Sequence, residues 1–78
     1  MSAAIITGGG GALGKGIASV LSAAGWKVVL ADLLEQHALE VSDELGGLPW
    51  KVLDVTKLDD VRRVFAEVAA EHGGIGAL

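Results

Sequence analysis

Three short apolar runs, each followed by a segment with helical periodicity, constrain the fold of this chain more strongly than any other feature. The runs span residues 3–7, 27–32 and 50–55, and most residues in each run are apolar and follow one another directly in the sequence. Such runs are typical of strands buried on both faces, as in a parallel sheet with helices on either side. Since strands and helices alternate with short connections, right-handed crossovers are expected between successive strands.

The segments that follow these runs have the apolar spacing of amphipathic helices. The first helix is expected to end at Gly25, the second to cover residues 33–45 with Gly46 after it, and the third to start after Thr56 as its N-cap and to end before Gly73. The expected apolar stripes are Ile17, Val20, Leu21 and Ala24, then Leu34, Ala38, Val41 and Leu45, then Val61, Val64, Phe65, Val68 and Ala69.

This order of elements predicts an α/β fold, a Rossmann-type βαβαβα half of a doubly wound parallel sheet. The sequence GGIGAL at residues 73–78 is typical of a turn and the first residues of a fourth strand. We therefore expect one domain, residues 1–78, that is incomplete after the third helix and lacks a full fourth strand and a catalytic half. An open edge on the first strand would leave these residues poorly stable or self-associated when isolated.

Composition excludes several classes of function. The net charge is −4, and only two of the six basic residues adjoin, so the chain has no basic patch for DNA or RNA. It has no cysteine, and its histidines at positions 37 and 72 are far apart, so neither a disulfide framework nor a metal site is expected. The first apolar run is too short for a signal peptide or a membrane span, which favours a cytoplasmic protein.

A run of four glycines, residues 8–11, joins the first expected strand to the first expected helix. Gly9-x-Gly11-x-x-Gly14 has the spacing of a dinucleotide-binding fingerprint at the place where that fingerprint belongs. Glycines allow the backbone to approach a pyrophosphate, which the N-terminus of the following helix attracts through its unpaired N–H groups. The turn is therefore a candidate phosphate-binding loop.

Carboxylates follow the other two expected strands at the same edge of the sheet. Asp32 lies eighteen residues after Gly14, where a carboxylate can bind both hydroxyls of an adenosine ribose. It would repel a 2′-phosphate, and the neighbouring Leu33 has no charge to bind one, so NAD is favoured over NADP. Asp54 could accept a hydrogen bond from the adenine amino group. By contrast, the pair Asp59–Asp60 is expected to be a solvated helix end near the positive end of the dipole.

Taken together, these motifs resemble those of the short-chain dehydrogenase/reductase family. The resemblance is carried by Thr7-Gly8-x-x-x-Ala12-x-Gly14, by VVLAD ending at Asp32 and by DVT at residues 54–56, and it covers the whole chain. It implies an NAD(P)-dependent oxidoreductase that transfers hydride between the cofactor and an alcohol or carbonyl substrate, and Asp32 with Leu33 favours NAD as that cofactor. The cofactor-binding residues that it implies are Gly8, Gly10, Gly11, Leu13, Gly14, Asp32, Leu33, Asp54 and Val55.

Two departures from the family pattern qualify this hypothesis. Ala12 stands where the family has glycine, which would cost roughly 1 kcal/mol if the position needed a positive φ. The catalytic serine, tyrosine and lysine of the family lie beyond its fourth strand, and this chain has no tyrosine. We therefore expect no catalytic competence from these 78 residues alone, and we expect a homo-oligomer or a companion chain that carries the remainder of the domain.

Two other hypotheses remain open. One is a non-catalytic module that binds or senses a dinucleotide, which the absence of catalytic residues on a companion chain would support. The other is the start of a flavin-binding domain, because Gly9-x-Gly11-x-x-Gly14-x-x-x-Ala18 also fits that fingerprint. A flavin-binding domain would leave the DVT motif unexplained.

Overall fold

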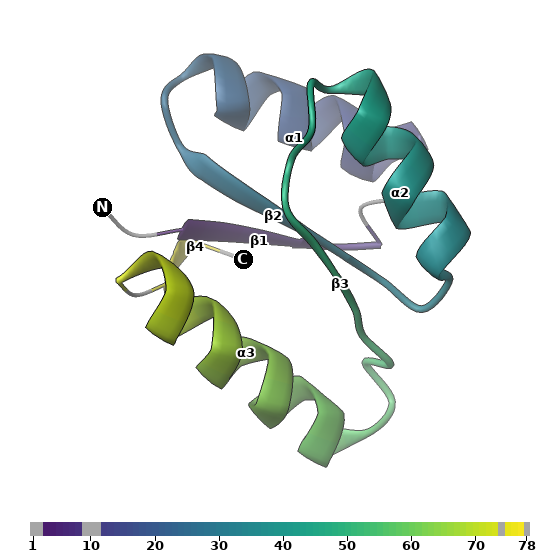
Figure 1. The fold of residues 1–78 in the computed structure, drawn as a ribbon, viewed down its shortest axis with the longest axis vertical. Helices are drawn as coiled ribbons and strands as arrows, with labels where there is room; N and C mark the ends of the chain where they lie inside the picture. Colours follow the sequence, from purple (N-terminus) through teal and green to yellow (C-terminus); the bar gives the residue numbers. More distant parts are fainter. Residues whose placement is uncertain (1–2, 9–11, 74, 78) are drawn as a thin grey trace.

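The computed structural model describes residues 3–8, 12–73 and 75–77, which form a parallel sheet between two layers of helices. The strand order is β3-β2-β1-β4, and each pair of neighbours is parallel. The α/β class and the alternation of strand and helix are confirmed (Figure 1). The elements are β1 (Ala3–Thr7), α1 (Ala12–Ala23), β2 (Lys27–Asp32), α2 (Glu35–Glu44), β3 (Trp50–Val52), α3 (Leu58–His72) and β4 (Ile75–Ala77).

Side chains on the two central strands alternate between two separate cores. Helices α1 and α2 lie on one side of the sheet and α3 on the other (Figure 1). On β1, Ala3 and Ile5 belong to the core against α3, whereas Ile6 belongs to the core against α1 and α2. On β2, Val29 faces α3 and Val28 faces the opposite core. Strands of this kind need apolar residues at every position, which explains their contiguous apolar runs.

The predicted stripe of α3 is confirmed, because Val64 and Val68 are fully buried and Val61 and Phe65 pack against the same core. The prediction for α2 is confirmed in part. Ala38 is buried, and Val41 and the C-cap Leu45 pack into the other core, whereas Leu34 precedes the helix and is exposed. The helix is shorter than the expected range of 33–45.

The predicted stripe of α1 is wrong, apart from Leu21. The helix buries Gly14 and Ala18 instead, while Ile17 and Val20 face outward. Small residues four positions apart let a helix lie close to a sheet, and that close approach decides which face is buried. The larger residues on the outer face give this helix a second stripe with the same period.

Helix α2 ends in a Schellman motif. The N–H of Gly47 donates to the carbonyl of Ser42 at 2.7 Å, and the N–H of Gly46 donates to that of Asp43 at 3.3 Å. Gly46 has a φ of +88°, in the left-handed region that a side chain disfavours. The same pair of bonds ends α1, where Trp26 donates to Leu21 and Gly25 to Ser22. These caps turn the chain back toward the sheet after each helix.

The third strand differs from its prediction. Strand β3 ends at Val52 rather than at residue 55, because the chain turns away at Asp54. A short fourth strand, β4, lies within residues 73–78, where the sequence predicted the first residues of such a strand. Strand β4 pairs with β1 at Ala3 and Ala4, so the edge of β1 is covered at its beginning. None of the helices in the described part of the chain is long and apolar enough to cross a membrane.

Candidate functional site

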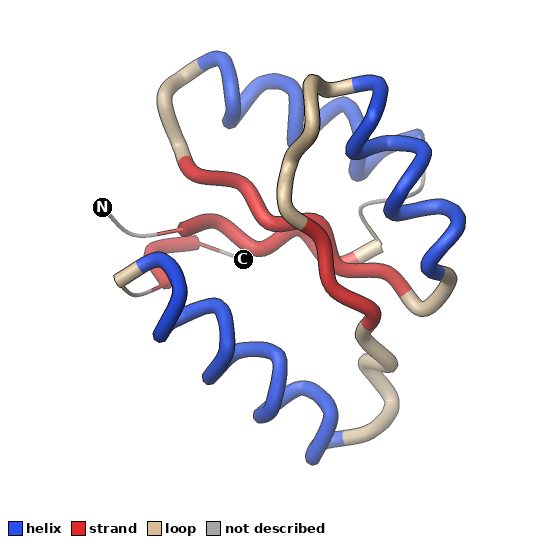
Figure 2. Tube along the Cα trace, viewed as in Figure 1, coloured by secondary structure: helices blue, strands red, loops and turns tan. Residues whose placement is uncertain are grey.

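The carboxyl ends of β1, β2 and β3 form one edge of the sheet. Thr7 pairs with Ala31, and Asp32 pairs with Val52. One further hydrogen bond, from the N–H of Leu53 to the carbonyl of Asp32 at 2.9 Å, extends this pairing beyond β3. The chain leaves β1, β2 and β3 on the same side of the sheet, at the right in Figure 2. In parallel sheets ligands bind at this edge.

The turn after β1 begins with Gly8, whose φ is +67° and whose backbone has open space on the side where a side chain would stand. The predicted Gly10 and Gly11 lie outside the described residues. Leu13 lies in the first turn of α1 with 80% of its surface exposed, whereas Gly14 is buried. The N-terminus of a helix that follows such a turn presents unpaired N–H groups, which bind anions.

Ala12 introduces no strain at this turn. It is the first residue of α1, and among the described residues no non-glycine residue has a positive φ. The departure from the family pattern at this position therefore costs nothing in backbone conformation. The alanine methyl group lies on an exposed part of the helix surface.

Asp32 is the last residue of β2 and is half-buried. Its Oδ1 accepts a hydrogen bond from the N–H of Leu34 at 3.0 Å, which closes a local turn and orients the carboxylate. Leu33, between these two residues, has an exposed side chain. The structure therefore places a carboxylate and an apolar side chain side by side at the predicted edge.

Asp54 anchors the loop after β3 through its own carboxylate. Its Oδ1 accepts hydrogen bonds from the hydroxyl of Thr56 at 2.5 Å and from the N–H of Thr56 at 2.9 Å. The bond from the hydroxyl and then the bond from the N–H lower the pKa of Asp54 below its ordinary value of 3.8. The carboxylate is thus ionised near neutral pH, and the side chain of Val55 beside it is exposed.

This arrangement corrects the prediction for Thr56. Lys57, and not Thr56, is the N-cap of α3, and it makes no capping bond through its side chain. Thr56 lies one residue too early because Asp54 draws the chain into a turn before the helix begins. Its hydroxyl therefore orients Asp54 and does not cap the helix.

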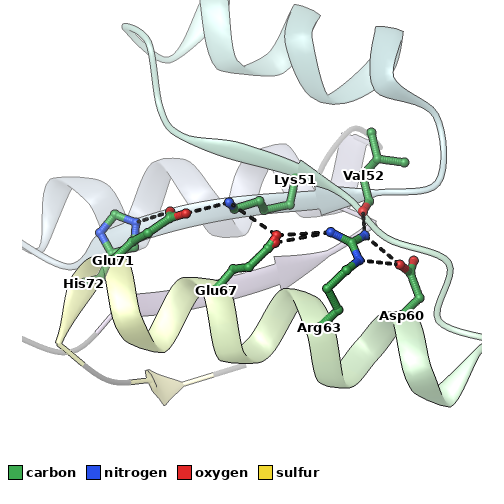
Figure 3. Close-up of polar contacts among 7 residues, drawn as sticks. All are labelled: Lys51, Val52, Asp60, Arg63, Glu67, Glu71 and His72. Atoms are coloured by element: carbon green, nitrogen blue, oxygen red, sulfur yellow. Dashed lines mark hydrogen bonds and ion pairs between the residues drawn. The ribbon is translucent and has the colours of Figure 1, made fainter.

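Asp60 and Arg63, which the sequence motifs do not indicate, hold the same loop from α3, and Figure 3 shows their contact with each other. Oδ2 of Asp60 accepts the N–H of Asp54 at 2.8 Å, and its Oδ1 accepts two bonds from Arg63, at 2.6 and 3.1 Å. The N–H of Asp54 and then Arg63 lower the pKa of Asp60. The expectation that Asp60 is merely solvated was wrong. The capping-box pattern would join a residue at this position to the N–H of the N-cap, Lys57, so it does not indicate the observed bond to the N–H of Asp54.

A line of ion pairs continues along α3 away from this loop (Figure 3). Arg63 contacts Glu67 at 3.1 Å, and Lys51 on β3 contacts Glu71 at 2.8 Å and Glu67 at 3.9 Å. The hydrogen bond from Lys51 lowers the pKa of Glu71. These pairs link β3 to α3 along its length. Among the described residues no cluster of side chains could hold a metal ion.

Two hollows in the described surface do not include Asp32 or Asp54. One, of about 480 Å³, is shallow and follows the outer face of α1, where it is lined by Leu13, Ile17 and Val20, among others. The other, of about 270 Å³, lies between Trp26, Pro49 and His72, at the opposite edge of the sheet.

The family model for short chain dehydrogenases matches residues 2–78. The chain is 40% identical over 70 residues to the short chain dehydrogenase/reductase dpfgG of Gibberella zeae, and this match covers 86% of the chain and 26% of the relative. It is 34% identical over 74 residues to L-fucose dehydrogenase of Bos taurus, and this match covers 95% of the chain and 27% of the relative.

A solved dehydrogenase structure also resembles this chain over most of its length. The citronellol catabolism dehydrogenase of Pseudomonas aeruginosa PAO1 superimposes with a TM-score of 0.87 and 31% identity, covering 95% of this chain and 33% of that chain. The chain thus spans about a quarter of the length of the curated relatives and about a third of that solved structure.

Proposed function

The chain belongs to the short-chain dehydrogenase/reductase family, and on that premise we propose that it forms the NAD-binding portion of an oxidoreductase. The observation that carries the proposal is the shared edge, where the turn after β1, Asp32 and the Asp54 loop follow three neighbouring strands. In open parallel sheets this edge is where nucleotides bind. When bound, NAD supplies the hydride acceptor or donor.

The donors and acceptors at this edge fit the parts of a dinucleotide. The N-terminus of α1 offers N–H groups to the pyrophosphate, and Gly8 leaves open space for a close approach. The carboxylate of Asp32 accepts hydrogen bonds from ribose hydroxyls, and that of Asp54 accepts one from the adenine amino group. Gly10, Gly11, Leu13, Gly14, Leu33 and Val55 complete the proposed cofactor-binding set.

Asp32 and Leu33 favour NAD over NADP. A 2′-phosphate would place its negative charge against the carboxylate of Asp32. Leu33, the next residue, has an apolar side chain that offers the phosphate neither a charge nor a donor. The chemistry of these two side chains supports an unphosphorylated ribose.

The acid/base step is proposed to depend on groups outside these residues. Transfer of hydride to or from an alcohol or carbonyl needs a general acid or base beside the reacting carbon. The 78 residues contain no tyrosine, the residue that performs this step in the family. We propose that the remainder of the domain or a companion chain supplies it, within an oligomer.

Titration calorimetry with NAD and NADP tests the proposal. The chain is expected to bind NAD more tightly than NADP. The variant Asp32→Ser is expected to weaken NAD binding by about tenfold, as the loss of a charged acceptor implies, and to reduce the preference for NAD over NADP. Asp43→Ser is a matched control, since it removes the same charge from an exposed position on α2. An unaltered chain that binds neither dinucleotide, or an Asp32→Ser variant that behaves like the control, would overturn the proposal.

A further inference from the structure

Asp60 ties the loop after β3 back to the first turn of α3. One carboxylate oxygen accepts the N–H of Asp54 in the loop after β3, and the other accepts the guanidinium of Arg63 on α3. The side chain of Asp60 is 23% exposed, so water screens these bonds only in part. Both oxygens therefore accept hydrogen bonds, one from the loop and the other from α3.

Arg63 is itself held in place. Its guanidinium contacts both oxygens of Glu67, at 3.1 and 3.2 Å, and its Nη2 donates to the carbonyl of Val52 at 3.5 Å. The connection therefore runs from the last residue of β3 through Arg63 and Asp60 to the N–H of Asp54. It ties the β3 end of the loop to α3, and Figure 3 shows the part from Val52 through Arg63 to Asp60.

The carboxylate of Asp54 depends on this connection for its direction. Thr56 holds Oδ1, so rotation of the side chain is limited by bonds within the loop. Those bonds orient the carboxylate relative to the loop, but they do not fix the loop itself. The bond from the N–H of Leu53 to the carbonyl of Asp32 ties the start of the loop to β2, and the bond from the N–H of Asp54 to Asp60 ties it to α3.

We propose that Asp60, supported by Arg63, is a positioning residue that aims the Asp54 carboxylate at the exocyclic amino group of the bound adenine. The inference rests on the proposed function, because it takes Asp54 as the group that meets the base. Asp60 does not contact the ligand. Its effect is to preserve discrimination between bases.

Discrimination between bases follows from the chemistry of an ionised carboxylate, which accepts hydrogen bonds and cannot donate them. Adenine presents an amino group to it, whereas hypoxanthine presents a carbonyl oxygen at the same position. A well-aimed carboxylate therefore favours NAD over nicotinamide hypoxanthine dinucleotide. A carboxylate that moves with a loose loop loses that preference, although the rest of the site still binds.

Binding of these two dinucleotides by the chain tests the proposal. Asp60→Ala is expected to weaken NAD binding three- to tenfold, about the effect of one hydrogen bond, and to leave binding of the hypoxanthine dinucleotide within about twofold. Arg63→Met leaves the bond between Asp60 and Asp54 intact, so it is expected to reduce the preference for NAD over the hypoxanthine dinucleotide by less. If Asp60→Ala fails to fold, as judged by circular dichroism, Arg63→Met tests the proposal in its place.

Asp59→Ala is the matched control, because it removes the same charge from the same first turn of α3 at an exposed position. It is expected to leave both affinities unchanged. Equal weakening of both dinucleotides by Asp60→Ala or by Arg63→Met would show a structural role only and would overturn the proposal, as would no change in either. An unaltered chain that binds neither dinucleotide overturns the proposed function itself, whereas one that binds both without preference overturns the role of Asp54 and Asp60.

Discussion

The hydroxyl of Ser42 on α2 donates a hydrogen bond to the backbone carbonyl of Leu48, six residues later, at 2.5 Å. Ser42 is 4% exposed, and its own carbonyl accepts the N–H of Gly47. One residue thus holds the turn between α2 and β3 through both its side chain and its backbone. This turn fixes where β3 joins the sheet.

Ser42→Ala is expected to lower the free energy of unfolding by about 1 kcal/mol, because the carbonyl of Leu48 loses its partner. Chemical denaturation measures the effect. Ser19→Ala, at an exposed position on α1, is the control and is expected to be neutral or slightly stabilising. Equal stability of the two variants would show that the Ser42 hydroxyl contributes nothing.

Glycine-to-alanine substitutions are expected to have opposite effects at two positions. Gly46 has a φ of +88°, so Gly46→Ala should destabilise the protein by about 1 kcal/mol. Gly16 lies within α1 with open space beside it, so Gly16→Ala should stabilise the protein by about 0.5–1 kcal/mol through helix propensity. Thermal unfolding compares the two variants, and a shift of the same sign in both would contradict the assigned backbone conformations.

Valine-to-alanine substitutions test which faces of the helices are buried. Val64 is fully buried against the sheet, so Val64→Ala should cost about 2–3 kcal/mol. Val20 is 70% exposed on α1, so Val20→Ala should change stability by less than about 0.5 kcal/mol. A large loss of stability for Val20→Ala would mean that the outer face of α1 is covered in solution.

Acid is expected to weaken the loop after β3. The pKa of Asp60 is lowered first by the N–H of Asp54 and then by Arg63, with Lys57 adding to the effect and the charge of Asp54 near by. A lowered folded-state pKa stabilises the protein above the unfolded value of 3.8, and this stabilisation is lost as the pH falls through the folded value. Unfolding midpoints between pH 5 and about pH 2 should therefore fall less steeply for Asp60→Asn than for the unaltered chain. Parallel pH profiles would contradict this assignment.

The parts of the fold that were predicted correctly are those where burial imposes a simple pattern. Strand β2 was expected at residues 27–32 and lies there, because a strand with two buried faces needs contiguous apolar residues. The stripe of α3 was also predicted correctly, because only one of its faces is apolar. On α1 two apolar faces compete. Their periodicity is the same, and the smallness of Gly14 and Ala18 decides which one meets the sheet.

The candidate site was predicted less completely than the fold. That Asp32 and Asp54 lie at the same edge of the sheet follows from the order of the strands, and the alternation of strands and helices already implies that order. The bond between Asp60 and Asp54 depends on the exact place where α3 begins. Thr56 has the stronger capping propensity, so the sequence predicts a helix that begins one residue too early and does not indicate the bond from Asp60.

The two-sided burial of β1 has a consequence for how its register is determined. Its residues Ala3, Ala4, Ile5 and Ile6 place one alanine and one isoleucine on each face of the sheet. A slip by one residue would exchange the faces, and these four residues would still present one alanine and one isoleucine to each core. A slip that brought the exposed Thr7 to the buried position of Ile6 is opposed by the polarity of its side chain, and the length of the connection to α1 also limits the register. The number of residues after Thr7 is for this reason a constraint on folding as well as on the cofactor, and inserting one glycine there would test both at once.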